Sequence, residues 1–189
     1  MISQLTGTIA FSGDKFVVLS VGGVGYHIKT TLDTERRAIE TAGDIIFYTH
    51  LAVREDALDL YGFLSRAELS FFQMLISVSG IGPKTALGIL NSAPIESLAS
   101  AIGMGDSASL SKISGIGAKN AQKIILELKE KVGVYSGKEM VGNYDAILAL
   151  QSLGYSAKEA RDAIQNIEKG TSEKDIIRKA LRIMSNNHK

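Results

Sequence analysis

Two short glycine-rich segments carry the residue types best suited to binding an anion. The first is Ser79-Gly80-Ile81-Gly82-Pro83-Lys84-Thr85-Ala86, and it returns 35 residues later as Ser114-Gly115-Ile116-Gly117-Ala118-Lys119-Asn120-Ala121. Glycine can adopt positive φ, so each segment can reverse sharply and bring bare backbone close to a ligand. We expect a helix to begin directly afterwards, with its first amides free to bind a phosphate. Lys84 and Lys119 would add a positive charge at each helix start.

Because the segments repeat with lysine at the same offset, we interpret them as paired phosphate-binding hairpins. The simpler interpretation is two compact turns with Ile81 and Ile116 buried between helices. A paired grip would read the nucleic-acid backbone and not the base sequence. Neither common nucleotide motif is present, because no strand precedes the glycines and no Gly-x-x-x-x-Gly-Lys-Ser/Thr occurs. The predicted DNA-binding residues are Gly80, Gly82, Lys84, Thr85, Gly115, Gly117, Ala118, Lys119, Asn120 and Lys123.

The elements that position these hairpins are predicted to be helices. Apolar residues recur at helical spacing from Ser65 onward, and Pro83 suits the first turn of a helix. Another helix would follow Pro94, and Asp106 or Ser107 could cap the next. The helix after the second hairpin would span 118–132. Residues 65–133 are therefore predicted to form a tandem helix-hairpin-helix domain.

Residues 1–64 have the composition of a small β-domain. Short stretches rich in β-branched and aromatic residues alternate with turn signals, at 4–10, 16–21, 25–30, 45–53 and 58–63. This pattern favours an OB-type barrel, with an SH3-like barrel as the alternative. The glycines at 22–25 are interpreted as a hairpin turn. Between the last two strands lies the charged turn Arg54-Glu55-Asp56.

The C-terminal third is predicted to form a separate unit. Residues 134–142 contain few apolar side chains and resemble a flexible linker. Three short amphipathic helices are expected beyond them, at 144–153, 157–167 and 173–184. The core of a bundle spanning 143–189 would be thin, so binding a partner would stabilise it.

The amino-acid composition limits the kinds of site that the chain can form. Cysteine is absent and the three histidines are scattered, so we expect no disulfide, no metal site and no cofactor. No stretch approaches the length of a membrane span, and we expect a cytoplasmic protein. Residues 1–64 hold five basic and eight acidic side chains, whereas 65–134 hold seven and five, and 135–189 nine and seven. The hairpins thus lie in a mildly basic segment behind an acidic one.

Several motifs taken together resemble the RuvA family, the Holliday-junction-binding subunits of bacterial branch migration complexes. The motifs are the two hairpins and the runs Thr49–Asp56, Val21–Tyr26 and Leu60–Phe63. The resemblance covers essentially the whole chain. It implies a multidomain α+β protein with an OB-type barrel, a tandem helix-hairpin-helix domain and a small UBA-like three-helix domain.

The resemblance also implies a function. A homotetramer, or an octamer of two tetramers, would hold a four-way junction open and flat without catalysing a reaction itself. Glu55 and Asp56 would form an acidic pin at its centre. The C-terminal domain would recruit a RuvB-type hexameric ATPase, with Leu150, Leu153 and Tyr155 as candidate contacts unless they only fill the core. A RuvC-type resolvase would be a further partner, in recombination, DNA repair and the SOS response. Family hairpins often carry two adjacent basic residues where this chain has Ala118-Lys119, which would lower affinity unless Lys123 compensates.

Two other functions are consistent with parts of the sequence. Helix-hairpin-helix DNA glycosylases carry a hairpin lysine and a catalytic aspartate some twenty residues later, and Asp106 lies 22 residues after Lys84. The chain lacks the extra helices of a base-flipping pocket, and Asp106 is better explained as a helix cap. A general single-strand binder using the barrel is the other alternative, although few exposed aromatic residues can be identified there from sequence.

Overall fold

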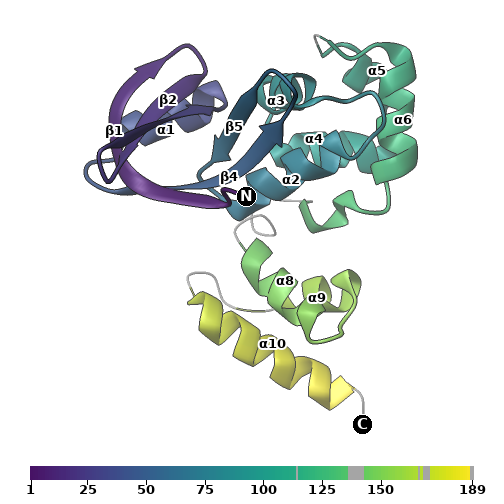
Figure 1. The fold of residues 1–189 in the computed structure, drawn as a ribbon. Helices are drawn as coiled ribbons and strands as arrows, with labels where there is room; N and C mark the ends of the chain where they lie inside the picture. The colour runs from purple at the N-terminus through teal and green to yellow at the C-terminus, as the bar shows by residue number, and fades with distance from the viewer. Residues whose placement is uncertain (114, 136–142, 166, 168–170, 188–189) are drawn as a thin grey trace.

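The computed structural model describes residues 1–113, 115–135, 143–165, 167 and 171–187. Figure 1 shows three parts in chain order: a β-barrel, a helical domain beside it, and three helices below both. This arrangement confirms the predicted fold class.

The N-terminal part is a closed five-stranded barrel with the strand order β1-β2-β3-β5-β4. Strands β3 and β5 pair in parallel, and the other neighbouring pairs are antiparallel. Alternate residues point inward, so that Val17, Leu19, Ile28 and Phe47 fill the interior. The strands are β1 (Gln4–Gly13), β2 (Phe16–Val21), β3 (Val24–Lys29), β4 (Ile45–Val53) and β5 (Leu58–Phe63).

A short helix, α1 (Leu32–Glu40), connects β3 to β4 and was missed by the sequence prediction. The Thr31 hydroxyl caps it by accepting the Thr34 N–H at 3.1 Å. The helix buries Ala38 against the barrel core, and most of its other side chains are polar. Because its apolar face is so short, the spacing of hydrophobic residues gave little indication of a helix. The capping threonine and the acidic first turn are the sequence features that do indicate one.

The middle domain is built from consecutive helices that surround one apolar core. This core includes Phe71, Leu75, Ile89 and Ile124, all almost completely buried. The helix after the second hairpin ends at Leu128, earlier than predicted, and a 3-10 turn follows. The elements are α2 (Arg66–Ile76), α3 (Pro83–Ser92), α4 (Ile95–Met104), α5 (Ser107–Ser111), α6 (Ala118–Leu128) and η1 (Val132–Tyr135).

The barrel and the middle domain share part of their core. Phe72 of α2 stacks on Tyr61 with a centroid distance of 5.3 Å and lies 5.1 Å from the ring of Phe63. Both of these partners belong to β5, and all three rings are nearly inaccessible. Aromatic contacts of this kind add to the free energy gained by burial. The barrel therefore holds its loops in a fixed position relative to the hairpins.

The three C-terminal helices have their own small core around Ile147, Leu150 and Ile164. They are α8 (Tyr144–Ser152), α9 (Ala157–Gln165) and α10 (Glu173–Asn187). Of the predicted linker, residues 134 and 135 belong to η1, and residues 136–142 lie outside the described part of the chain.

Two tyrosines join the C-terminal helices to the middle domain. Tyr144, at the start of α8, stacks on Tyr135 with a centroid distance of 5.5 Å. Both hydroxyls donate to Ser70 Oγ of α2, from 3.0 Å for Tyr135 and 2.5 Å for Tyr144. Burial raises the pKa of Tyr135, so its phenol remains a donor at neutral pH. We call these three residues the tyrosine joint.

Candidate nucleic-acid interface

The first glycine segment forms a tight turn between α2 and α3. Gly80 has φ of 92°, a conformation that a side chain strains, and Gly82 returns to extended geometry at φ −86° and ψ 170°. Between them the Ile81 N–H donates to the Val78 carbonyl at 3.0 Å. The Ile81 side chain is 4% exposed and lies in the domain core. The isoleucine thus anchors the turn while both glycines face solvent.

The second segment repeats this geometry. Gly115 has φ of 87°, and Gly117 has φ −76° and ψ 161°. The Ile116 N–H donates to the Ile113 carbonyl at 3.0 Å, and the Ile116 side chain is buried in the same core. The sequence repeat is therefore also a repeat of backbone structure, which a pair of unrelated turns would not produce.

The helices that follow the two turns begin without a side-chain cap among the described residues. By contrast, Ser65 caps α2 and Asp106 caps α5. The first amides of α3 and α6 are thus left open at the positive end of each helix dipole. Lys84 and Lys119 are exposed in these first turns. Each hairpin combines backbone donors with one exposed lysine, an arrangement suited to binding an anion such as phosphate.

The two hairpins lie next to each other. Lys123 of α6 donates from Nζ to the carbonyl of Ser79, beside the first hairpin, at 3.4 Å. Asn120 Oδ1 lies 3.5 Å from the position that a Cβ on Gly80 would take. Lys123 therefore sits between the hairpins, whereas Ala118 is exposed at the start of α6 and adds no charge. The structure thus brings Asn120 and Lys123 of the second unit against the first hairpin, and the other residues predicted to bind DNA lie in the two turns and at the starts of α3 and α6.

The acidic turn is the tip of the β4–β5 hairpin. The Arg54 N–H donates to the Ala57 carbonyl at 2.8 Å, which leaves Glu55 and Asp56 exposed at the tip. Below the tip, Asp59 pairs with the Arg54 guanidinium and with Lys29 Nζ, the latter at 2.6 Å. The hydrogen bond from Lys29 is the main cause that lowers the pKa of Asp59, against the opposing effect of burial. These ion pairs stabilise the base of the turn and place Arg54 and Lys29 below the exposed carboxylates of the tip.

Lys29 was not predicted as part of any site. It lies 30 residues from Asp59 in sequence, and only the parallel pairing of β3 with β5 brings the two together. The charged run around Arg54 was visible in the sequence, but the ion pair between Lys29 and Asp59 was not.

Comparison with known proteins matches each part of the chain to a family model. Residues 1–62 match the RuvA N terminal domain, residues 72–130 the SAM-like helix-hairpin-helix tandem, and residues 143–185 the RuvA C-terminal domain. The Holliday junction branch migration complex subunit RuvA of Pseudomonas fluorescens SBW25 is 35% identical, covering 97% of this chain and 100% of that protein. The chain belongs to the RuvA family. The proteins of the same name from Desulforamulus reducens and Bordetella pertussis are 37% and 39% identical, covering 93% and 97% of this chain and 92% and 99% of their own lengths.

Membership of the RuvA family does not favour the glycosylase alternative, and neither does the position of Asp106. Its carboxylate accepts the Ser109 N–H at 3.0 Å as the cap of α5. Hydrogen bonding to Ser109 lowers the pKa of Asp106, so this carboxylate is ionised and occupied in a helix cap. Among the described residues, no group of His, Asp or Glu side chains could hold a metal ion.

The RuvA C-terminal domain contains the three predicted partner contacts in different environments. Leu150 is completely buried in the core of this domain, Tyr155 is half-buried beside it, and Leu153 is 58% exposed. Leu148 of α8 is also 41% exposed. A partner that meets the folded domain would therefore touch Leu153 and Leu148 first.

No helix in the described parts of the chain has the length and apolar content needed to cross a membrane.

Proposed function

We propose that this protein binds four-way DNA junctions by their structure, holds them open and flat, and recruits a motor ATPase that moves the branch point. It would perform no catalysis itself. The observation that carries the proposal is the pair of adjacent hairpins with the same backbone geometry, uncapped helix starts and exposed lysines. The relatives named as branch migration complex subunits support it, since the match covers 100% and 92% of their lengths.

Each subunit would use both hairpins to grip one duplex arm. Two phosphate sites on one rigid core fix the orientation of an arm but read no bases, which suits a junction of arbitrary sequence. Four subunits around the crossover would hold four arms, so we propose a homotetramer, alone or as two tetramers enclosing the DNA. Glu55 and Asp56 would then converge at the centre. Carboxylates close to phosphates repel them, and this would keep the exchanging strands apart.

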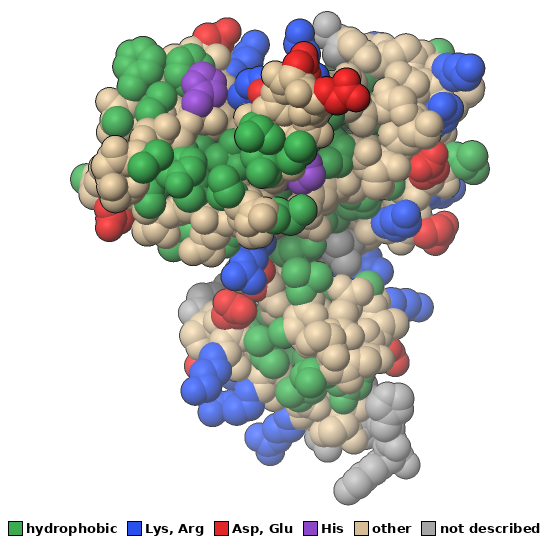
Figure 2. Space-filling view, in the orientation of Figure 1, with side chains coloured by type: hydrophobic (Ala, Val, Ile, Leu, Met, Phe, Trp, Pro, Cys, Tyr) green, Lys and Arg blue, Asp and Glu red, His purple; other side chains and the backbone are tan. Residues whose placement is uncertain are grey.

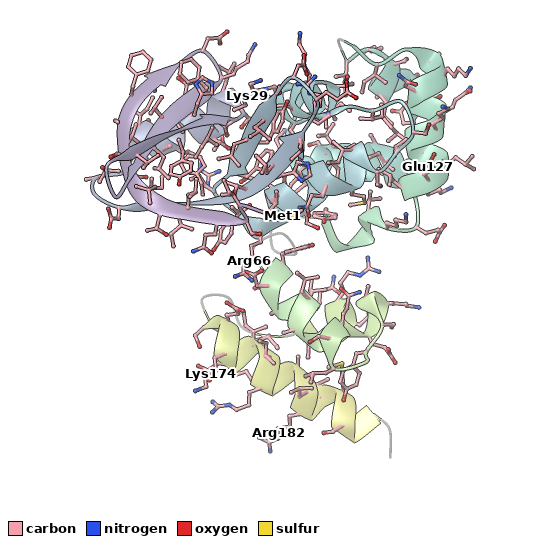
Figure 3. All side chains as sticks on the ribbon, in the orientation of Figure 1. Met1, Lys29, Arg66, Glu127, Lys174 and Arg182 are labelled. Atoms are coloured by element: carbon pink, nitrogen blue, oxygen red, sulfur yellow. The ribbon has the colours of Figure 1, made fainter. Side chains whose placement is uncertain are left out.

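The C-terminal domain would dock a RuvB-type hexameric ATPase through the exposed apolar residues Leu153 and Leu148. Because Leu150 is buried, its role in this contact would be to support α8 from below. Figure 3 shows Lys174 and Arg182 pointing outward from α10, on the side of this domain away from the barrel. A RuvC-type resolvase would act on the same open junction, and the setting would be recombination and DNA repair in the cytoplasm.

Binding to a synthetic immobile junction, measured against a linear duplex of equal length, tests the junction proposal. We expect strong preference for the junction and a steep loss of affinity with salt. Lys84→Ala and Lys119→Ala should each weaken binding by about 1 kcal/mol and lower the salt slope by about one unit. Lys129→Ala, an exposed lysine at the far end of α6, is the matched control. Equal affinity for both DNAs would refute the proposed function.

The partner surface is tested separately by Leu153→Asp in the full chain. We expect normal junction binding but loss of stimulation of the motor ATPase, because a charge would be buried on docking. Ile39→Asp is the matched control, since this α1 side chain is 52% exposed on the barrel domain. If Leu153→Asp stimulates the motor normally, the assigned docking surface is wrong.

A further inference from the structure

A groove of about 800 Å³ lies between the barrel and the first hairpin. Its barrel side is formed by the β1–β2 loop, by Phe16 of β2, by His27 and Lys29 of β3, and by the parts of β4 and β5 nearest the acidic turn. Its other side is the start of α3, including Gly82, Pro83 and Lys84. Figure 3 labels Lys29 where the barrel meets the helical domain, at this groove. The groove is therefore continuous with the first hairpin.

Aromatic rings form a row on the barrel side of this groove. The rings of Phe16 and His27 are stacked, with centroids 4.3 Å apart and planes 16° from parallel. Phe11 lies next to Phe16, 5.9 Å away and 60% exposed, but outside the lining of the groove. The strand register aligns them, because Phe11 and His27 both pair with Val18 across β1-β2-β3. His27 is exposed and lines the groove, so its ring is accessible from the groove.

The charged residues around the row favour an anion. Lys15, Lys29, Arg54 and Lys84 line the groove, against the carboxylates of Asp14 and Asp59. Asp59 is already paired with Lys29 and Arg54, so the groove keeps a positive excess. Figure 2 shows this face of the barrel, with histidines among hydrophobic side chains and basic side chains beside acidic ones.

The backbone around Lys15 is held in place. Lys15 has φ of 64°, unusual for a residue with a side chain. Its N–H donates to Glu35 Oε2 at 3.0 Å, and its carbonyl accepts the Thr30 N–H at 2.9 Å. A residue kept in this conformation by two bonds presents its side chain from a fixed point at the groove.

We infer that this groove binds unpaired nucleotides of the junction, with one base stacked on the His27–Phe16 pair and the flanking phosphates near Lys15 and Lys84. In OB-type barrels the face of strands 2 and 3, between the β1–β2 and β4–β5 loops, is where oligonucleotides bind. Stacked rings beside a cationic track are the means by which proteins hold single strands without reading sequence. The inference rests on the proposed function, since the unpaired nucleotides would be those of a bound junction, and the groove adjoins the first hairpin at Gly82 and Lys84.

The inference gives the barrel an active part in opening the junction. The acidic tip repels phosphates, and the groove beside it would hold the bases that lose their pairing partners. Unpaired bases stacked on protein rings recover part of the stacking energy lost in the duplex. Strand separation at the crossover would then be stabilised by attraction as well as by repulsion.

The experiment compares two junctions, one fully paired and one with two mismatched pairs at the crossover. The full chain should bind the mismatched junction more tightly, because opening mismatched pairs costs less free energy than opening matched ones. In His27→Ala, and in His27→Ala combined with Phe16→Leu, this preference should fall by about tenfold, within the range measured for base–aromatic stacking. Ile46→Ala, an apolar residue 43% exposed on β4 and away from the groove, should leave the preference unchanged.

Photocrosslinking identifies the contact directly. A junction with 5-iodouracil at the crossover should crosslink to His27 or Phe16, and one with the label eight pairs into an arm should not. Two results would overturn the inference: no crosslink to His27 or Phe16, or an unchanged mismatch preference in both variants. If the protein still preferred junction over duplex in either case, the proposed function would stand. Smaller assemblies in solution for the His27→Ala protein would overturn the inference too, because the rings would then be a contact between copies of the chain. Loss of junction preference in the unmodified protein would refute the proposed function itself.

Discussion

Replacing Gly80 by alanine tests whether the hairpin backbone needs glycine. Gly80 has φ of 92°, and an added Cβ would meet only Asn120 Oδ1 at 3.5 Å, an ordinary contact distance. The cost is therefore conformational and not steric, about 1–2 kcal/mol for a side chain at positive φ. For a chain of this size that corresponds to a melting temperature lower by about 2–8 °C. Junction affinity should also fall, because a turn that relaxes to accommodate the side chain moves the open amides of α3.

Gly88→Ala is the matched control for this substitution. Gly88 lies inside α3, exposed, with no atom near the position of an added Cβ. Alanine is favoured over glycine in a helix by about 1 kcal/mol, so this variant should melt at a higher temperature. Calorimetry of both variants, with gel-shift titration of a junction, measures the two effects. A Gly80→Ala protein that melts no lower than the parent and binds the junction equally well would refute the argument from backbone strain.

Two further predictions concern the acidic turn and the tyrosine joint. Glu55→Gln with Asp56→Asn should tighten junction binding by about threefold at low salt and by less at high salt, because salt screens the repulsion. The control Glu40→Gln on α1 should leave binding unchanged. If the double variant changed neither binding nor the rate of branch migration, the turn would be an ordinary loop. Ser70→Ala removes the acceptor shared by two buried phenols and should cost about 1–3 kcal/mol, with faster amide exchange in α8. Tyr144→Phe, which removes only one donor, should have a smaller effect, and equal exchange in all three proteins would show that the joint does not hold α8.

The order of domains could be predicted because it depends on local patterns. Stretches rich in β-branched and aromatic residues between turn signals predicted the barrel strands, and helical spacing with capping residues predicted the middle and C-terminal helices. The repeat of Gly80 and Gly82 at Gly115 and Gly117 identified both hairpins without a structure. Helix α1 was missed because a short and mostly polar helix gives a weak periodic signal.

The sequence alone determined which residues carry backbone freedom and charge: the hairpin glycines, Lys84 and Lys119, and the acidic pair Glu55-Asp56. These features are local, since the chemistry depends on residue types at fixed short spacing. What each of them faces was decided only by the tertiary structure. Lys123 reaches Ser79 across 44 residues, Lys29 meets Asp59 through parallel strands, and Phe16 stacks on His27 across β2 and β3. Such neighbours follow from strand register and helix packing, which depend on contacts throughout the core and leave no short-range mark in the sequence.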